Sequence, residues 1–357
     1  MLATIILFIL LLGLLVLVHE WGHFIVARKL GVRVEEFAFG FPPRILSFVR
    51  KGTRYAVNLL PLGGYVKIFG EGGEGAGEPG SFASRPPWQR LSILAAGVAM
   101  NVMLAWVLFS IGHGLGLPTA VPDDAAAGGA VTVVAVSPGS PAEQAGLRLG
   151  DAIEKLKSKN QIVKIERIGK VQEFIQTYRG EEITITVRRG RETRDVVAVP
   201  RAEPPPGEGS LGIAMTRVEI VRSPWYRAGF DGLITTGRAT GAIVIALGRL
   251  VSELFGTGRV PVDVAGPVGI FAFTRETLEL GFPYFLQLAA ILSVNLAILN
   301  ILPIPALDGG RVLFLFFEKL RGRRVHPKFE QALHTIGLAL LLALMAAITY
   351  RDIVRVF

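Results

Sequence analysis

The chain has 357 residues, of which 51% are hydrophobic and 19% are charged, and its formal net charge is +9. This composition argues against a single soluble globular domain and indicates a membrane protein with several spans and a soluble part. We interpret its positive charge as Lys and Arg residues that face anionic lipid and fix the topology, and not as a surface for nucleic acid. There is no cysteine, which excludes disulfides and thiolate metal sites, so any metal must be held by His and carboxylate side chains.

The N-terminal segment is an unbroken apolar run, residues 2–18, that leads directly into His19-Glu20-Trp21-Gly22-His23. It has no basic n-region and no small-residue cleavage site. We therefore interpret residues 2–28 as a retained transmembrane helix and not as a signal peptide. At about 1.5 Å of rise per residue, His19 lies about 27 Å along this helix, within or just inside one face of the bilayer.

The motif H-E-x-x-H gives this segment its chemistry. On a helix, His19 and His23 lie on one face and can hold one divalent metal ion, while Glu20 can reach a water beside that ion as a general base. The alternative is that the two His residues lie at the water-facing end of a membrane helix without a metal. It does not explain a Glu between them so close to the hydrocarbon of the bilayer. The motif therefore predicts a catalytic metal centre.

A basic loop follows at residues 29–88. By the positive-inside rule its charges place it on the cytoplasmic side, with the N-terminus outside. The Lys and Arg residues in or beside it are Arg28, Lys29, Arg33, Arg44, Arg50, Lys51, Arg54, Lys67, Arg85 and Arg90.

Within this loop, residues 55–69 are strand-like, and a break at residues 61–64 predicts a hairpin. The segment is too apolar for an ordinary solvated loop, and it can dip into the membrane beside the metal if protein or a water cavity covers its backbone. The alternative is a plain surface hairpin. We expect its edge to bind an extended substrate strand by β-addition. The residues of this edge are Tyr65, Val66, Lys67 and Ile68.

A second transmembrane helix is predicted at residues 91–117, which completes a membrane part at residues 1–120. Asn101 lies inside this helix. It is either a polar bridge between helices, the interpretation that we favour, or a residue that lines the site.

The next part of the chain has the pattern of a soluble module. Strand-like segments at residues 131–136, 183–187 and 196–199 flank the region of Ser137-Pro-Gly-Ser-Pro-Ala-Glu-Gln-Ala-Gly-Leu147, which resembles a bacterial PDZ domain. We predict a compact α+β module at residues 126–202. Such modules bind peptide C-termini or act as steric filters.

Residues 203–282 are predicted to be a linker followed by a helix on the membrane surface. Residues 223–255 are amphipathic, because Asp231, Arg238 and Arg249 interrupt the apolar residues. We expect this helix to lie on the membrane and not to cross it. If it crossed, the later topology would invert.

A third transmembrane helix is predicted at residues 284–304, within a last membrane part at residues 283–357. Pro303 and Pro305 must end it. Asp308 then stands on irregular backbone beside apolar sequence, where a carboxylate is by default a functional candidate. It is either the third metal ligand or an N-cap for the following helix.

Glu35 and Glu36 on the cytoplasmic loop remain alternative third ligands. After Asp308, a second basic loop, with Arg321, Arg323, Arg324 and Lys328, is predicted on the same cytoplasmic side. Residues 329–350 form the fourth transmembrane helix and leave the C-terminus outside. His326 and His334 are interpreted as structural.

Taken together, His19-Glu20-Trp21-Gly22-His23, the PDZ-like module, Gly266-Pro-Val-Gly-Ile270 and the segment Asn300 to Gly310 (NILPIPALDGG) resemble the site-2 protease family of intramembrane zinc metalloproteases, in its bacterial regulator-of-sigma-E type. The chain shows one PDZ-like module where some members carry two, and it lacks a Pro that relatives often have after Gly97.

The resemblance implies a zinc metalloendopeptidase of regulated intramembrane proteolysis. Zinc would be held by His19, His23 and Asp308, with Glu20 as the base, and Asn300 would bind substrate or support the oxyanion. The implied substrates are single-span membrane proteins, such as anti-sigma factors, or remnant signal peptides. The implied place is the bacterial inner membrane, with the PDZ-like module and both termini outside the cytoplasm and the active site near the cytoplasmic face.

The expected fold is therefore a polytopic α-helical membrane protein with about four transmembrane helices, a membrane-associated β-hairpin and an inserted α+β PDZ-like domain. Two rival functions are weighed against the protease. A membrane-tethered adapter with a dead site predicts a damaged motif, yet the motif is intact. A metal transporter needs ligands along a path, whereas these ligands cluster at one depth.

Overall fold

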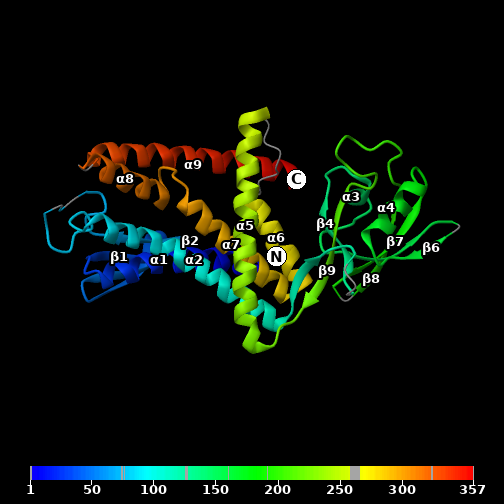
Figure 1. The fold of residues 1–357 in the computed structure, drawn as a ribbon, viewed down its shortest axis with the longest axis horizontal. Helices are drawn as coiled ribbons and strands as arrows, with labels where there is room; N and C mark the ends of the chain where they lie inside the picture. The colour runs from blue at the N-terminus through cyan, green and yellow to red at the C-terminus, as the bar shows by residue number, and fades with distance from the viewer. Residues whose placement is uncertain are drawn as a thin grey trace. The chain divides into compact units, whose positions relative to one another are not determined.

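The computed structural model describes residues 2–73, 75, 77–124, 128–159, 161–190, 192–257, 266–322 and 325–356 (Figure 1). The predicted domain boundary at residue 126, together with Arg323 and Arg324 of the second basic loop, lies outside these residues. The chain divides into two compact units. The first unit comprises Met1–Ile111, Gly229–Thr274 and Leu288–Phe357, and the second comprises Gly112–Ala228 and Arg275–Gln287.

Long helices dominate the first unit. Among the described residues, 5 helices are long and apolar enough to cross a membrane, namely α1 (Leu2–Lys29), α2 (Pro87–Leu115), α5 (Trp225–Thr257), α7 (Phe282–Ile301) and α9 (Pro327–Val356). Two shorter helices, α6 (Pro267–Leu280) and α8 (Asp308–Arg321), connect them. Four of the five match the predicted transmembrane helices. The fifth is α5, for which the placement on the membrane surface stays a prediction.

A long antiparallel hairpin lies beside α1. It consists of β1 (Val34–Arg50) and β2 (Thr53–Ile68), and its turn is Lys51-Gly52. The predicted break at residues 61–64 lies where β2 reverses its direction, because residues 54–57 and 64–67 pair with the same residues 36–39 in opposite order. The two halves of residues 55–69 do not pair with each other as a simple hairpin, because β1 lies between them. Lys51 and Gly52 adopt φ values of 49° and 77°, which a tight hairpin turn requires, whereas the Pro and Gly residues fall at irregularities of register within the ladder.

Two parts of this hairpin differ in exposure. Near α1, the side chains of Phe37 and Ile68 are buried in a cluster with Phe24 of that helix, and Arg28 donates a hydrogen bond of 3.1 Å to the backbone oxygen of Lys51 in the turn. Elsewhere along the two strands, large apolar side chains are exposed instead. These are Phe41, Ile45, Leu46, Phe48, Val49, Leu59 and Leu60. The hairpin is therefore anchored beside the end of α1 and presents an apolar surface over other parts of its length.

The second unit contains a 7-stranded sheet with the order β3-β9-β4-β5-β7-β8, with β6 paired to β5. Its strands are β3 (Leu117–Val121), β4 (Ala130–Val136), β5 (Ala152–Lys157), β6 (Ile162–Lys164), β7 (Ile183–Arg189), β8 (Glu192–Ala198) and β9 (Ile213–Val221). Two helices, α3 (Pro141–Gln144) and α4 (Ile168–Thr177), contribute Ala142 and Phe174 to its core.

The sheet extends beyond residues 126–202, because β3 and β9 lie on either side of that range in sequence and pair with each other. Leu117 is opposite Val221 and Val121 is opposite Arg217. The segments that enter and leave this domain therefore form one antiparallel ribbon, which we call the β3–β9 ribbon.

The motif Gly266-Pro-Val-Gly-Ile270 forms the start of α6. A carboxylate oxygen of Asp352 on α9 accepts hydrogen bonds from the backbone N–H groups of Gly266 and Gly269, at 2.8 and 2.9 Å. Because the first N–H groups of a helix have no partner within it, this carboxylate caps α6.

Close packing between α1 and α2 places the second helix against the His pair. A Cβ atom added at Gly22 would lie 2.4 Å from the backbone oxygen of Ala96, and one at Gly97 would lie 2.4 Å from Nε2 of His23. Only residues without a side chain fit there, and this allows the two backbones to approach closely.

Candidate metal centre

Two histidines on one turn of α1 form the first part of the site. His19 and His23 are 6% and 5% exposed, and their Nε2 atoms are 3.1 Å apart. The helix is continuous through the motif, so the spacing of four residues places both rings on the same face, as the sequence predicts.

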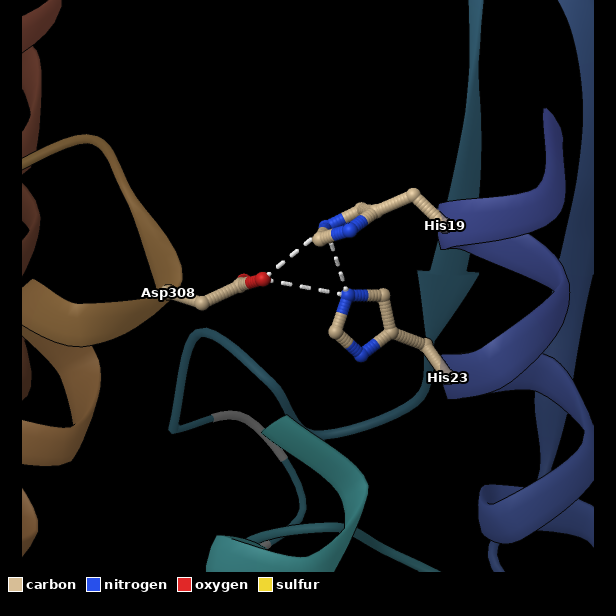
Figure 2. Close-up of side chains that lie close together, drawn as sticks. All are labelled: His19, His23 and Asp308. Atoms are coloured by element: carbon tan, nitrogen blue, oxygen red, sulfur yellow. Dashed lines mark hydrogen bonds and ion pairs between the residues drawn. The ribbon is translucent and has the colours of Figure 1, made fainter. Parts of the chain in front are cut away.

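Asp308 completes the group from a distant part of the chain. After α7 ends at Ile301, residues 302–307 turn the chain, and α8 begins at Asp308. Its Oδ2 atom lies 3.0 Å from Nε2 of His19 and 3.2 Å from Nε2 of His23. Figure 2 shows the three side chains pointing toward one another. The N-cap residue of α8 is Leu307, so Asp308 is not the N-cap that the sequence left open as an alternative.

Two glycines after Asp308 let the chain make this turn. A Cβ atom at Gly309 would lie 2.2 Å from the backbone oxygen of Leu302, and one at Gly310 would lie 2.5 Å from that of Ile304. The first turn of α8 thus stacks directly on the loop that ends α7. Because the two residues after Asp308 have no side chains, the chain can turn closely enough for the carboxylate to reach the His pair.

The alternative ligands, Glu35 and Glu36, are engaged elsewhere. Glu35 forms an ion pair with Lys67 at 2.9 Å, and Glu36 forms one with Arg44 at 2.8 Å. Within the described parts of the chain, the group of three or more His, Asp or Glu residues that could hold a metal ion is His19, His23 and Asp308.

The geometry of this group fits a zinc ion. Its three ligand atoms form a triangle with sides of 3.0, 3.1 and 3.2 Å. In a tetrahedral zinc site with bonds of about 2.0–2.1 Å, ligand atoms are about 3.3–3.4 Å apart, so a small expansion would admit the ion. Two imidazoles and a carboxylate also leave the fourth position open, as in catalytic zinc sites.

The backbone of α2 fixes the ring of His23. Its Nδ1 atom lies 2.8 Å from the carbonyl oxygen of Ile93, to which it donates a hydrogen bond. The proton is therefore on Nδ1, which leaves the lone pair of Nε2 for a metal ion. Such contacts behind a ligand set its tautomer and its orientation.

Glu20 is held beside the metal group by the hairpin. One oxygen of its carboxylate accepts a hydrogen bond of 3.0 Å from the backbone N–H of Val66 on β2. Glu20 also lines a cavity of about 180 Å³ together with His19, Asn300 and Asp308. A single water needs only roughly 10–15 Å³ of such space, so the cavity has room for water and for part of a substrate.

Asn300 approaches the same cavity from α7. Its Nδ2 atom lies 3.4 Å from Nε2 of His19. Its place in the sequence, before the two prolines that end α7, brings the amide to the depth of the metal group. An amide N–H at this position can donate to a substrate oxygen.

The four residues of the predicted substrate edge have different environments. The hydroxyl of Tyr65 donates to Glu36 at 3.0 Å, Lys67 pairs with Glu35, and the side chain of Ile68 is 4% exposed in the apolar cluster. The backbone N–H of Val66 is the group that the structure brings to the site, through Glu20.

Two parts of the site were missed by sequence reasoning. Gly97 has a recognisable signal, a small residue on a helix that must pass close to two buried His side chains. The carbonyl of Ile93 has none, because a backbone acceptor is independent of the side chain and depends on how α2 is rotated about its axis.

Comparisons with known proteins agree with this chemistry. The family model described as peptidase family M50 matches residues 7–344. The chain is 30% identical to the zinc metalloprotease RasP of Oceanobacillus iheyensis over 447 aligned positions, which cover 99% of both chains. It is 32% identical to a putative zinc metalloprotease of Clostridium acetobutylicum over 358 positions, which cover 98% of this chain and 97% of the relative. It is 30% identical to the regulator of sigma-W protease RasP of Bacillus subtilis over 439 positions, which cover 99% of both.

Proposed function

Since this chain belongs to peptidase family M50 and is a zinc metalloprotease, we propose that it cleaves peptide bonds within or near the transmembrane segments of single-span membrane proteins. The observation that carries the proposal is the position of the metal group. His19, His23 and Asp308 converge between apolar helices of a multi-pass membrane protein, with Glu20 on a shared cavity. A peptide bond that reaches this cavity is exposed to water inside an apolar surrounding.

The residues of the cavity have separate roles in the proposed reaction. A zinc ion held by His19, His23 and Asp308 would supply Lewis acidity, which makes water more acidic and polarises the scissile carbonyl. Glu20 would take a proton from the attacking water and return it to the leaving amine. The amide of Asn300 would donate a hydrogen bond to the oxygen on which negative charge develops.

The proposed substrate must be extended where it is cut. A helical segment has its carbonyls in hydrogen bonds and must lose them locally before one can be attacked. The edge of β2 at residues 65–68 lies beside Glu20 and could hold such a segment by β-addition. The exposed apolar residues of the hairpin support its placement in the membrane.

Anti-sigma factors and remnant signal peptides are the substrates that we propose. The name of the Bacillus subtilis relative, regulator of sigma-W protease, supports the first class. Both classes are single apolar spans, which is the substrate form that a site between membrane helices can accept.

We propose the bacterial inner membrane as the location, with the sheet domain and both termini outside the cytoplasm. The basic residues of the loop between α1 and α2 support this orientation. It requires that α5 does not cross the membrane. In Figure 1, α5 runs crosswise to α1 and α2. If those two helices cross the bilayer, α5 runs parallel to the bilayer plane, as a surface helix does.

Contacts between α2 and α5 support the crosswise arrangement. Nε1 of Trp106 donates a hydrogen bond of 2.8 Å to the backbone oxygen of Gly229, and a Cβ atom at Gly232 would lie 2.7 Å from the backbone nitrogen of Ser110. The start of α5 is thus pressed against the last turns of α2.

The sheet domain is proposed to be PDZ-like and to act as a filter on the outer side. None of its described residues belongs to the metal group or lines the cavity beside it. Its role would therefore be to admit substrates whose outer part has already been trimmed.

The test is cleavage by the purified full-length protein in proteoliposomes. Wild-type protein with zinc should cut a single-span substrate into two fragments that mass spectrometry identifies, and the cut should lie in or near the span. An adapter would bind the substrate without cutting it, and a transporter would move zinc across the sealed vesicle. Either result in place of cleavage would reject the proposal.

A further inference from the structure

Asn101 on α2 lies directly behind the metal group. Its side chain is fully buried, and its Nδ2 atom is 3.3 Å from Nδ1 of His19. Its Oδ1 atom is buried and has no hydrogen-bond partner.

The protonation of His19 decides which end of the amide must face it. Nε2 of His19 points at Oδ2 of Asp308, at 3.0 Å, on the side where the metal would bind. To bind a metal through Nε2, the neutral ring must carry its proton on Nδ1. An Nδ1–H group needs an acceptor, and an amide nitrogen is not one.

A half-turn of the amide resolves this conflict. The nitrogen and oxygen of an Asn side chain have nearly the same shape, and their assignment follows from the hydrogen bonds that they make. With the two atoms exchanged, Oδ1 lies beside Nδ1–H of His19 and gains a partner. We propose that the carboxamide oxygen of Asn101 accepts the Nδ1 proton of His19 and thereby orients this ring toward zinc.

The rest of α2 supports this assignment. Ile93, Gly97 and Asn101 are spaced by four residues and lie on one face of the helix. The carbonyl of Ile93 accepts the Nδ1 proton of His23, Gly97 provides the space for both rings, and Asn101 holds His19. One face of α2 thus orients both His ligands, and Asn101 is a positioning residue and more than a bridge between helices.

This inference rests on the proposed metal site, and the test separates the two. The dissociation constant of the zinc complex is measured on the purified full-length protein by competition with a chelator. This measurement does not depend on cleavage. Asn101→Leu keeps the size of the side chain but has no acceptor. We expect a loss of zinc affinity of about 10–100-fold, as for other residues that orient a metal ligand.

Two further variants make the result specific. Asn101→Asp keeps an acceptor oxygen at the same place and should retain affinity within a few-fold of wild type. Ser293→Ala is the control for helix packing, because the hydroxyl of Ser293 donates to the backbone oxygen of Asn101 at 2.8 Å and does not touch the amide. It should bind zinc as wild type does.

Three outcomes would overturn the inference. These are full affinity in Asn101→Leu, equal losses in Asn101→Leu and Asn101→Asp, and an equal loss in Ser293→Ala. Failure of the metal site itself would look different, because His19→Ala would then bind zinc as tightly as wild type.

Discussion

The backbone N–H of Val66 donates a hydrogen bond of 3.0 Å to a carboxylate oxygen of Glu20, and so connects the β-hairpin to the proposed base. One oxygen of the carboxylate is held in this way, and the other stays available to a water in the cavity. The hairpin cannot move freely along α1, since the space beside Gly13 is filled by the ring of Phe39. We expect β2 to orient the base as well as to hold the substrate.

Val66→Pro is the variant that tests this relationship, because Pro removes the N–H and keeps an apolar side chain. With one oxygen of Glu20 released, we expect kcat for a short peptide substrate to fall by about 10-fold or more, since general bases contribute about 10²–10⁴-fold. Zinc content, measured by mass spectrometry, should stay near that of wild type. Val49→Pro, in β1 opposite Arg54 and not opposite Val66, is the control and should keep its kcat. An unchanged kcat in Val66→Pro would show that the contact does not orient the base.

Glu20→Gln tests the role of the base itself. The amide cannot accept a proton from water, so we expect cleavage to fall by about 10²–10⁴-fold or more. Because Glu20 is not one of the three proposed ligands, zinc should remain near one ion per chain. A loss of zinc together with activity would show that Glu20 is a ligand and that its role is assigned wrongly.

Gly97→Ala tests the close approach of α2. The new methyl group would lie 2.4 Å from Nε2 of His23 and 2.6 Å from Cε1 of His19, so one ring must move. We expect zinc occupancy and cleavage to fall together. Gly241→Ala is the matched control, because Gly241 is also inside a helix and has no atom within 4 Å of a new Cβ. Normal zinc binding by Gly97→Ala would mean that α1 and α2 can separate there without loss of zinc affinity.

Asp308→Ala tests the third ligand. Removing one of the three proposed ligands should lower zinc occupancy and abolish cleavage. Glu35→Ala and Glu36→Ala should leave zinc occupancy unchanged, because these carboxylates pair with basic side chains away from the group. The decisive measurement is a zinc K-edge spectrum, which should give two imidazoles and one carboxylate at about 2.0–2.2 Å in the wild type and lose the carboxylate in Asp308→Ala.

Replacement of the sheet domain tests the proposed filter. Val121 and Arg217 are opposite each other in the β3–β9 ribbon, so residues 122–216 can be replaced by a short Asn-Gly turn that closes the ribbon as a hairpin. We expect this variant to cleave short substrates as wild type does and to accept substrates with bulky outer domains. A variant that binds zinc but cleaves nothing would make the domain part of the catalytic unit.

The metal group could be predicted from the sequence because the patterns that indicate it are local. The spacing of His19 and His23 on an apolar helix defines one face, and Pro303 and Pro305 require the chain to turn just before Asp308. The break near residue 62 could be predicted because Pro and Gly are strong local signals, whereas the Lys51-Gly52 turn has weaker signals and was missed. Only the pairing with residues 34–50 shows that the two halves of β2 lie on either side of β1. The pairing of β3 with β9 is equally non-local, since it joins residues on either side of the inserted domain.

The cap that Asp352 provides for α6 has a practical consequence for mapping topology. Reporter proteins are commonly joined to truncated chains, and a truncation within α9 before residue 352 would leave the N–H groups of Gly266 and Gly269 without their acceptor. Such a fusion would report on a molecule in which α6 has lost its cap. A reporter joined after Val356 keeps the carboxylate in place, so its signal refers to the intact arrangement of helices.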